Sequence, residues 1–408
     1  MFYKNRILYI QYTNPTAYPP LQHGSRILAR TGCESVFLGV DIDDAERLSF
    51  PLHANIRVYK IPACLPGWRQ KIHYLQYALW AWLWVLRWRP QWIYASDLLT
   101  CPIAYGLSLL PGVRVIYHEH DSFHGATTGS FFTNLCLKAR ARLAQRSVAC
   151  ILPNQARLSQ FCMQNPGTHA PFCVWNCPAL EEVSDPQPDL FEHQDLWLLY
   201  HGSIVPDRLP LAVLDSLCLL PRSVKLRVIG YETSGHRGYI AQILARATEL
   251  GLLKRLEIME AMPRQELLKW CGKSHIGLAL MPLISDDLNM TSMIGASNKP
   301  FDYLACGLPL VVADLPDWQA MYVEPGYALA CNPEDPESIA AAIGWYLTHP
   351  TEMRAMGEQG RQRILADWNY EAQFSVVKSQ IFPPLLQDNI PTSGIPLTSV
   401  GSDSVKSS

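Results

Sequence analysis

The sequence predicts an α/β protein built from two parallel-sheet domains. Short apolar runs with strand character alternate with helical segments along most of the chain, an order that produces parallel sheets covered by helices. The 408 residues exceed what one ordinary hydrophobic core organises, so two domains are expected. Residues 181–195 are acidic, contain prolines and lack periodicity, which predicts a linker between the domains.

Composition and charge exclude several classes of protein. The formal net charge of −2 gives no support for nucleic-acid binding, which needs a strong basic excess. The 12 cysteines form no C-x-x-C pair, so neither a metal signature nor a disulfide framework is indicated, and a reducing, cytoplasmic setting is expected. The N-terminal residues lack the pattern of a secretory signal peptide.

The first half of the chain opens with a β–loop–α–β unit. Residues 7–10 are the first expected strand, 21–30 a helix and 35–40 the next strand. The loop between the first strand and the helix is rich in Asn and Pro. Ligands of such sheets gather at the carboxyl ends of the strands, so this loop, with Asn14, is predicted to line a cleft.

Two helical stretches of the first half allow two interpretations each. Residues 72–88 combine four tryptophans with leucines and flanking basic residues, which suits either a helix packed against the sheet or one lying on a membrane surface. Residues 131–148 carry Lys138, Arg140, Arg142 and Arg146, which suits either a solvated face or contact with anionic lipid.

Further strands are expected at 92–95, 113–117 and 150–154. The second of these leads into His118-Glu119-His120-Asp121 at its carboxyl end. The two histidines invite a metal interpretation, but no third ligand has diagnostic spacing, and a role in the cleft is better supported.

The second half restarts the strand pattern at 196–200 and leads into Gly202, Ser203 and Arg208. A glycine at a strand exit lets a ligand approach the backbone, and a forked, permanently charged arginine suits a diphosphate. Strands are also expected at 224–230, 256–260 and 276–280.

The most informative stretch is 297–314. Ser297 or Asn298 can cap a short helix that Gly307 ends, and residues 310–313 form a buried strand. Lys299 lies at the helix N-terminus, where the dipole favours anions, so a nearby phosphate would explain it. The alternative is a solvated pair between Lys299 and Asp302, three residues apart.

This stretch resembles the nucleotide-sugar segment of retaining GT-B glycosyltransferases of the family 4 (group 1) type, where (S/P)-N-K-x-F-E-Y-x-A-x-G-x-P-V-V recurs. The resemblance implies the GT-B fold, with two Rossmann-like domains facing across a cleft. It implies that Asp302 binds the donor ribose and that Asn298 and Lys299 face the diphosphate. The family has a second Glu eight residues before the first, where this chain has Ile294.

Other segments resemble the same family. Gly202 and Arg208 match its G-R-x-x-x-x-K loop, with Ser203 in place of the Arg, and His120-Asp121 matches a His–acid pair whose His faces the transferred sugar. Backbone near Met262 would hold the base. The implied catalytic groups are His120, Arg208 and Lys299, with Asn14 and Asp121 on the acceptor side.

The resemblance also sets the expected domain organisation. An acceptor-side domain would cover 1–180 and a nucleotide-sugar-binding domain 196–365. A C-terminal helix within 366–387 would return to the first domain, and 388–408, rich in Ser, Thr, Gly and Pro, would be a disordered tail.

The expected activity is metal-independent hexosyl transfer, with retention, from a nucleotide-diphosphate-sugar to a glycan or lipid-linked acceptor in cell-surface polysaccharide or glycolipid synthesis. No cofactor is implied beyond this co-substrate. An anionic membrane surface is a further expected partner, at the inner face of the membrane. A nucleotide-sugar epimerase of the same fold and a non-catalytic, membrane-associated partner subunit are the alternatives.

One tripeptide favours a different architecture. Asp41-Ile42-Asp43 follows the second strand, and D-x-D binds the metal in GT-A glycosyltransferases. Two acidic residues in a loop after a strand are more often a solvated turn.

Overall fold

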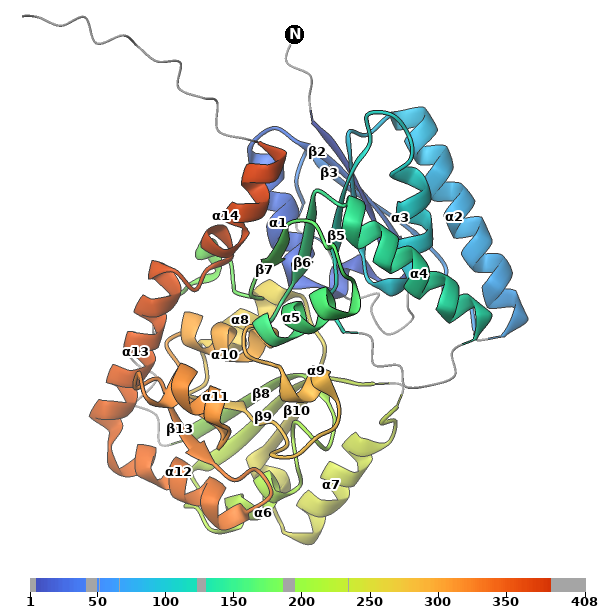
Figure 1. The fold of residues 1–408 in the computed structure, drawn as a ribbon. Coiled ribbons are helices and arrows are strands. Elements are labelled where there is room, and N and C mark those ends of the chain that lie inside the picture. Colours follow the sequence, from blue (N-terminus) through green and yellow to red (C-terminus); the bar gives the residue numbers. More distant parts are fainter. Residues whose placement is uncertain are drawn as a thin grey trace, which may run out of the picture.

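The computed structural model describes residues 5–41, 50, 52–65, 67–122, 130–185, 195–233 and 235–382. It contains two α/β domains, each built on an all-parallel sheet, so the predicted fold class is confirmed (Figure 1). The GT-A interpretation of Asp41 to Asp43 is therefore wrong. Asp41 lies 2.7 Å from the ammonium of Lys60, and Asp43 falls outside the described residues, as does the predicted tail 388–408.

The N-terminal sheet has seven strands in the order β3-β2-β1-β4-β5-β6-β7. The order reverses between β1 and β4, and ligands of such sheets bind at the carboxyl ends of the strands beside that reversal. The strands are β1 Arg6–Ile10, β2 Glu34–Val40, β3 Ile56–Ile61, β4 Trp92–Ser96, β5 Arg114–His118, β6 Ala149–Leu152 and β7 Pro171–Cys173. The helices are α1 Pro19–Arg30, α2 Trp68–Trp88, α3 Cys101–Leu107, α4 Phe131–Arg146 and α5 Gln155–Gln164.

The C-terminal sheet has six strands in the order β10-β9-β8-β11-β12-β13, with its reversal between β8 and β11. Its strands are β8 Leu196–Ile204, β9 Val224–Glu232, β10 Leu256–Glu260, β11 Ile276–Ala279, β12 Leu310–Ala313 and β13 Ala328–Cys331. Its helices are α6 Ala212–Cys218, α7 Tyr239–Glu249, α8 Arg264–Cys271, α9 Leu288–Thr291, α10 Asn298–Ala305, α11 Pro316–Trp318, α12 Pro336–Thr348 and α13 Pro350–Ala366.

The last helix, α14 (Tyr370–Ile381), leaves the C-terminal domain and runs along α1 of the first domain (Figure 1). Tyr370 and Phe374 belong to the same buried cluster as Leu21 and Leu28 of α1. A Cβ on Gly24 would lie 3.3 Å from the Phe374 ring, so the small residue lets the two helices approach. This apolar contact ties the end of the chain to the first domain.

The loop that precedes α10 is held by the opposite domain. Asn176 donates through Nδ2 to the carbonyl of Ala296 at 2.7 Å, and Asn154 donates to the carbonyl of Ile294 at 2.6 Å. Gly295 in this loop has φ +78°, and a Cβ there would lie 2.3 Å from the Trp175 ring. The N-terminus of α10 is therefore positioned by contacts between the domains.

Helix α2 packs one face on the N-terminal core and exposes the other. Its tryptophans at 80, 82, 84 and 88 are half-buried against the core, whereas Leu79 and Leu83 are exposed. Among the described residues, no helix is long and apolar enough to cross a membrane.

The basic residues of α4 do not form one solvated face. Arg140 is buried and donates through Nε and Nη2 to the two carboxylate oxygens of Glu119, at 2.6 Å each. The carboxylate offsets the cost of burying the guanidinium. Arg140 is therefore a core residue, which corrects the prediction for that position, while Lys138 and Arg142 remain exposed.

Candidate active site

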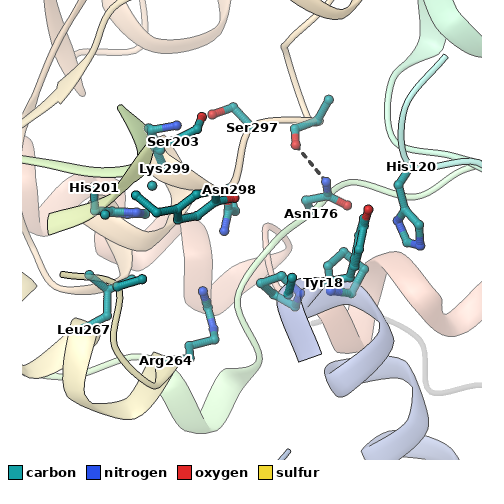
Figure 2. A pocket seen from close by; sticks show the side chains of 18 of the residues that line it. Tyr18, His120, Asn176, His201, Ser203, Arg264, Leu267, Ser297, Asn298 and Lys299 are labelled. Atoms are coloured by element: carbon teal, nitrogen blue, oxygen red, sulfur yellow. Dashed lines mark hydrogen bonds between the residues drawn. The ribbon is translucent and has the colours of Figure 1, made fainter. Parts of the chain in front are cut away.

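A cavity of about 270 Å³ lies between the two domains. One wall comes from the first domain, with Tyr18 ahead of α1 and His120 after β5. The opposite wall comes from the exit of β8 and the N-terminus of α10. Figure 2 shows His120 and Tyr18 facing Ser203, Asn298 and Lys299 across this space. Both walls lie at carboxyl ends of parallel strands, where ligands bind in this class of fold.

Lys299 is a buried cation at the start of α10. Its ammonium lies over the Tyr200 ring, 5.4 Å from the ring centroid, and makes no ion pair with any described residue. Burial, followed by the neighbouring Arg208 charge, lowers the pKa of Lys299 to about 7, while Asp302 acts in the opposite direction. The pair between Lys299 and Asp302 that the sequence left open is absent. An anion in the cavity would compensate this charge.

Gly202 makes room for Lys299. Its φ is +101°, a conformation that L side chains rarely adopt, and a Cβ there would lie 3.2 Å from the Lys299 ammonium. Next to it, Arg208 donates through Nη1 to the hydroxyl of Ser203 at 3.1 Å, and its buried Nε has no partner in the structure. Ser203 therefore orients Arg208 and leaves part of the guanidinium for a ligand.

The charges that line the cavity are unbalanced. Three cations that line it, Arg157, Arg208 and Lys299, have no carboxylate paired with them among the described residues. The one carboxylate among the described lining residues is Asp121. Together with the free N–H groups of the first turn of α10, these cations make the cavity a site for an anion with several charges.

Asp302 occupies a different place from the predicted one. It is fully buried and does not line the cavity. Arg264, which does line the cavity, donates to both carboxylate oxygens of Asp302, at 3.0 and 2.6 Å. Direct contact between Asp302 and a ribose would require Arg264 to move, so Asp302 stands behind Arg264 in this structure.

Arg264 also joins the two domains. It donates to Glu182 at 2.7 and 2.9 Å, and Glu182 lies 3.0 Å from Nε2 of His23 on α1. Burial, which raises the pKa of Glu182, is outweighed by Arg264 and His23, so that pKa falls well below 4.5. The chain of contacts from His23 to Asp302 is almost closed to solvent.

The wall opposite Lys299 contains a neutral histidine. Burial lowers the pKa of His120 to about 3, and its ring lies against His118 at 3.9 Å and Tyr18 at 4.7 Å. Asp97, at the end of β4, accepts a hydrogen bond from the backbone N–H of His120 at 2.9 Å. Asp97 has φ +65° and ψ 170°, a strained conformation for a residue other than glycine, and such strain concentrates at functional sites.

A second cavity of about 530 Å³ lies on the first-domain side of His120. Asp121 lines both cavities, and Asp97, Tyr12 and Phe132 line the second. Burial raises the pKa of Asp97 to about 8, with the nearby Asp121 acting in the same direction. The second cavity therefore offers carboxyl and aromatic groups beside the site of expected chemistry.

The structure brings most of the predicted site residues together. Those that line the interdomain cavity are His120, Asp121, Gly202, Ser203, Arg208, Met262, Asn298 and Lys299. Asn14 does not line it: its side chain caps the 3-10 turn Pro15–Ala17 and is 1% exposed, while Tyr18 from the same loop does line it. Arg157, Arg264 and Asp97 were missed because each is placed by partners distant in sequence.

Metal ligands were not expected in the sequence. Among the described residues, no group of three or more His, Cys, Asp or Glu side chains is arranged to hold a metal ion.

Comparisons with known proteins agree with this geometry. Residues 216–377 match a protein-family model described as glycosyl transferase-like. No curated protein sequence matches the chain.

Solved structures share both domains at low sequence identity. Sucrose-phosphate synthase from Thermosynechococcus elongatus has a TM-score of 0.69 and 14% identity, over 93% of this chain and 99% of that one. HepE from Anabaena, solved with UDP and glucose, has a TM-score of 0.67 and 13% identity, over 92% and 99%. WaaG, a glycosyltransferase involved in lipopolysaccharide biosynthesis, has a TM-score of 0.62 and 12% identity, over 91% and 98%. At such identities the likeness establishes the fold.

The fold and the matched domain together define the class of protein. The chain has the GT-B fold, and it carries a glycosyl transferase-like domain in its C-terminal half that ends within α14.

Proposed function

We propose that the chain transfers a hexose, with retention and without a metal ion, from a nucleotide-diphosphate-sugar to a glycan or lipid-linked acceptor. The observation that carries this proposal is the convergence of Lys299, Arg208 and the N-terminus of α10 on one cavity, without a paired carboxylate. A diphosphate supplies the anion that this arrangement needs.

The donor would lie across the cavity with its diphosphate against α10. Arg208 and Lys299 would bind the diphosphate, with Asn298 and Gly202 offering backbone groups and Met262 lying by the base. HepE has been solved with UDP and UDP-glucose, so a uridine nucleotide is the first donor to test. Asp302 would reach the ribose only after Arg264 shifts.

The chemistry follows from this placement. The acceptor hydroxyl attacks the anomeric carbon while the bond from that carbon to the diphosphate oxygen breaks. The electron pair of that bond goes to the leaving diphosphate, and the proton of the acceptor hydroxyl goes to the leaving oxygen on the same face, which retains the configuration. Arg208, Lys299 and the helix N-terminus would stabilise the charge that develops on the diphosphate.

His120 would face the transferred sugar as a neutral hydrogen-bonding group, because burial keeps its pKa near 3. Asp121 would contact the acceptor, since it lines both the donor cavity and the second cavity. Asn14, buried as a cap, would shape this side through its loop and not by contact.

A role in cell-surface polysaccharide or glycolipid synthesis is supported by the likeness to WaaG and to the lipopolysaccharide galactosyltransferase WaaB. A nucleotide-sugar donor and a lipid-linked acceptor would meet in the cytoplasm, at the inner face of the membrane. We place the chain there, as a peripheral protein.

The test begins with thermal unfolding in the presence of different nucleoside diphosphates. A diphosphate at about 100 times its dissociation constant should stabilise the protein by about 2.7 kcal/mol. The matching nucleotide-sugar is then incubated with membrane glycolipid extracts and, separately, alone. Transfer only with acceptor supports the proposal, conversion of the sugar without acceptor indicates an epimerase, and no nucleotide binding indicates a non-catalytic subunit.

A further inference from the structure

Helix α2 carries a continuous apolar surface that nothing in the chain covers among the described residues. Its inner face buries Tyr74, Tyr77, Ala81 and Val85. Its outer face exposes a row of six side chains, here called the leucine stripe: Trp68, Ile72, Leu75, Leu79, Leu83 and Leu86, each 47–67% exposed. The spacing of three and four residues aligns them on one side of the helix.

Single exposed apolar residues are normal on protein surfaces, but a contiguous row marks an interaction site. Figure 1 shows α2 at the outer edge of the first domain, with α3 on its inner side. Trp82 packs against Gly106 of α3, where a Cβ would lie 3.0 Å from its ring. The tryptophans at 80, 82, 84 and 88 therefore attach α2 to the protein, and the leucine stripe faces away from it.

The charged residues of α2 and of its C-cap are all basic. The sequence of α2 contains no acidic residue. Arg69 and Lys71 lie at one end, and Arg87 and Arg89 lie at the other, all exposed. The occupant of this face must therefore combine an apolar interior with a negatively charged rim.

We propose that α2 lies flat on an anionic lipid bilayer, with the leucine stripe at the acyl boundary and the four basic residues among the headgroups. An interfacial helix of this kind needs an apolar face, a basic rim and its other face engaged elsewhere. A second copy of the chain fits less well. Two α2 helices packed through their stripes would bring Arg69 and Lys71 near basic residues of the other copy, with no acidic residue on the helix to offset them.

Helix α4 carries an exposed face of similar composition. Phe131 and Leu135 are 87% and 46% exposed, and Lys138 and Arg142 continue the same face of the helix. The start of α4 packs against the inner face of α2, because the Phe132 ring lies 4.9 Å from the ring of Tyr74. Apolar residues followed by basic ones repeat the arrangement seen on α2.

The position of the second cavity favours a bilayer as the partner that covers the leucine stripe. This step rests on the proposed function. Tyr12 and Phe132 line that cavity and contact Tyr74 at 5.2 and 4.9 Å. Tyr74 belongs to the inner face of the helix that carries the stripe. The side chains of Tyr12 and Phe132 and the width of helix α2, about 10 Å, lie between the acceptor-side cavity and the proposed membrane surface. A lipid-linked acceptor could then enter the cavity while its tail stays in the bilayer.

The experiment is co-sedimentation of the full chain with phosphatidylglycerol–phosphatidylcholine vesicles and with phosphatidylcholine vesicles. We expect binding to the anionic vesicles that weakens as salt rises. Leu79→Gln with Leu83→Gln should lower the partition coefficient by about tenfold or more. Arg69→Gln with Lys71→Gln should lower it and flatten its salt dependence. The matched control is Leu219→Gln with Leu253→Gln, because these leucines of the second domain are 57% and 52% exposed, and it should bind like the parent.

Three results would overturn the proposal: no binding of the parent to anionic vesicles at low salt, parent-like binding of the stripe variant, or a concentration-dependent dimer that the stripe variant abolishes without any vesicle binding. Nucleoside diphosphate binding, measured in solution on the same variants, should be unchanged. A parent protein that binds the nucleoside diphosphate but no anionic vesicles refutes the docking surface alone, and a parent protein that binds the vesicles but no nucleoside diphosphate refutes the donor site alone.

Discussion

At the scale of the residue, Lys299 is a buried cation without a paired carboxylate among the described residues. A lysine is stable in a buried position when it is neutral or paired with an anion. The pKa of about 7 means that the charged and neutral forms of Lys299 are about equally populated at neutral pH. A bound diphosphate would raise that pKa and keep the ammonium charged. Binding above pH 7 should therefore take up a proton.

The sign of this linkage gives a pH prediction. Diphosphate affinity should fall as pH rises above 7, by up to about tenfold per pH unit, because the free protein loses a proton that the complex retains. The last proton of the ligand dissociates near pH 6, so it contributes little there. Lys299→Met should remove the slope in calorimetric titrations, and Lys254→Met, at an exposed lysine, should keep it. A flat affinity from pH 7 to about 9 in the parent would contradict this account of Lys299.

His120 gives the second prediction at this scale. His120→Ala should lower turnover by at least about tenfold, the loss of one hydrogen bond in the transition state, while nucleoside diphosphate affinity stays nearly intact. Because the pKa of His120 is about 3, titration of His120 should cause no change in the turnover of the parent between about pH 5 and 8. His236→Ala, at an exposed position, serves as the control. Equal losses of turnover and affinity would make His120 a structural core residue.

At the scale of the element, α10 and β12 show what a sequence can predict. The stretch 297–314 carries its own signals, and the structure has the helix at Asn298–Ala305, Gly307 at φ +76° and the strand at Leu310–Ala313. The glycine and the buried apolar run are local signals, so the predicted bounds were close. Ser297 stands at the N-cap position, but its side chain makes no capping hydrogen bond. Strand β3, Ile56–Ile61, was missed because it lies at the sheet edge and none of its residues is buried: Arg57 and Tyr59 are exposed and the others are half-buried.

The loop before α10 shows what a sequence does not contain. Arg157 of α5 donates to the carbonyl of Ser292 at 2.9 Å, to that of Asn289 at 3.2 Å and to that of His120 at 3.2 Å. No local pattern relates residues so far apart in the chain. The same holds for Arg264 and Asp302: the sequence predicted a ribose ligand at Asp302 without its buried partner.

Arg157 can be tested as a positioning residue. Arg157→Lys keeps the charge but loses the fork that reaches three carbonyls, so it should lower the free energy of unfolding by about 1.5–3 kcal/mol and weaken diphosphate binding. Urea unfolding and calorimetry measure the two effects. If Arg157→Lys matches the parent in both while Arg157→Met does not, the residue acts through its charge and does not position α10.

At the scale of the whole molecule, buried charges join the two domains. Arg264 is the centre of the network, with Glu182 and Asp302 as its carboxylate partners. Arg264→Met would leave two buried carboxylates without their cation and should cost about 3–5 kcal/mol of unfolding free energy. Adding Asp302→Asn should recover part of that loss, since it removes one unpaired charge.

The loss of stability at low pH tests the same network of Arg264, Glu182 and Asp302. The lowered pKa of Glu182 means that its contribution to stability is present above pH 4.5, its ordinary value, and is lost as pH falls further. Arg264→Met should therefore flatten the loss of stability in acid. A cost below about 1 kcal/mol at neutral pH, the range of surface pairs, would show that the network is not a structural link between the domains.

The central claim is that Arg208, Lys299 and the N-terminus of α10 bind the diphosphate of a nucleotide-sugar. The measurement that tests it most directly is the affinity of the parent, Arg208→Ala and Lys299→Ala for a nucleoside diphosphate and for the matching monophosphate. Each variant loses a charged partner worth about 1.5–3 kcal/mol, so diphosphate affinity should fall about ten- to a hundredfold and monophosphate affinity much less. If both variants stay folded and bind the diphosphate like the parent, the donor site lies elsewhere and the account is wrong.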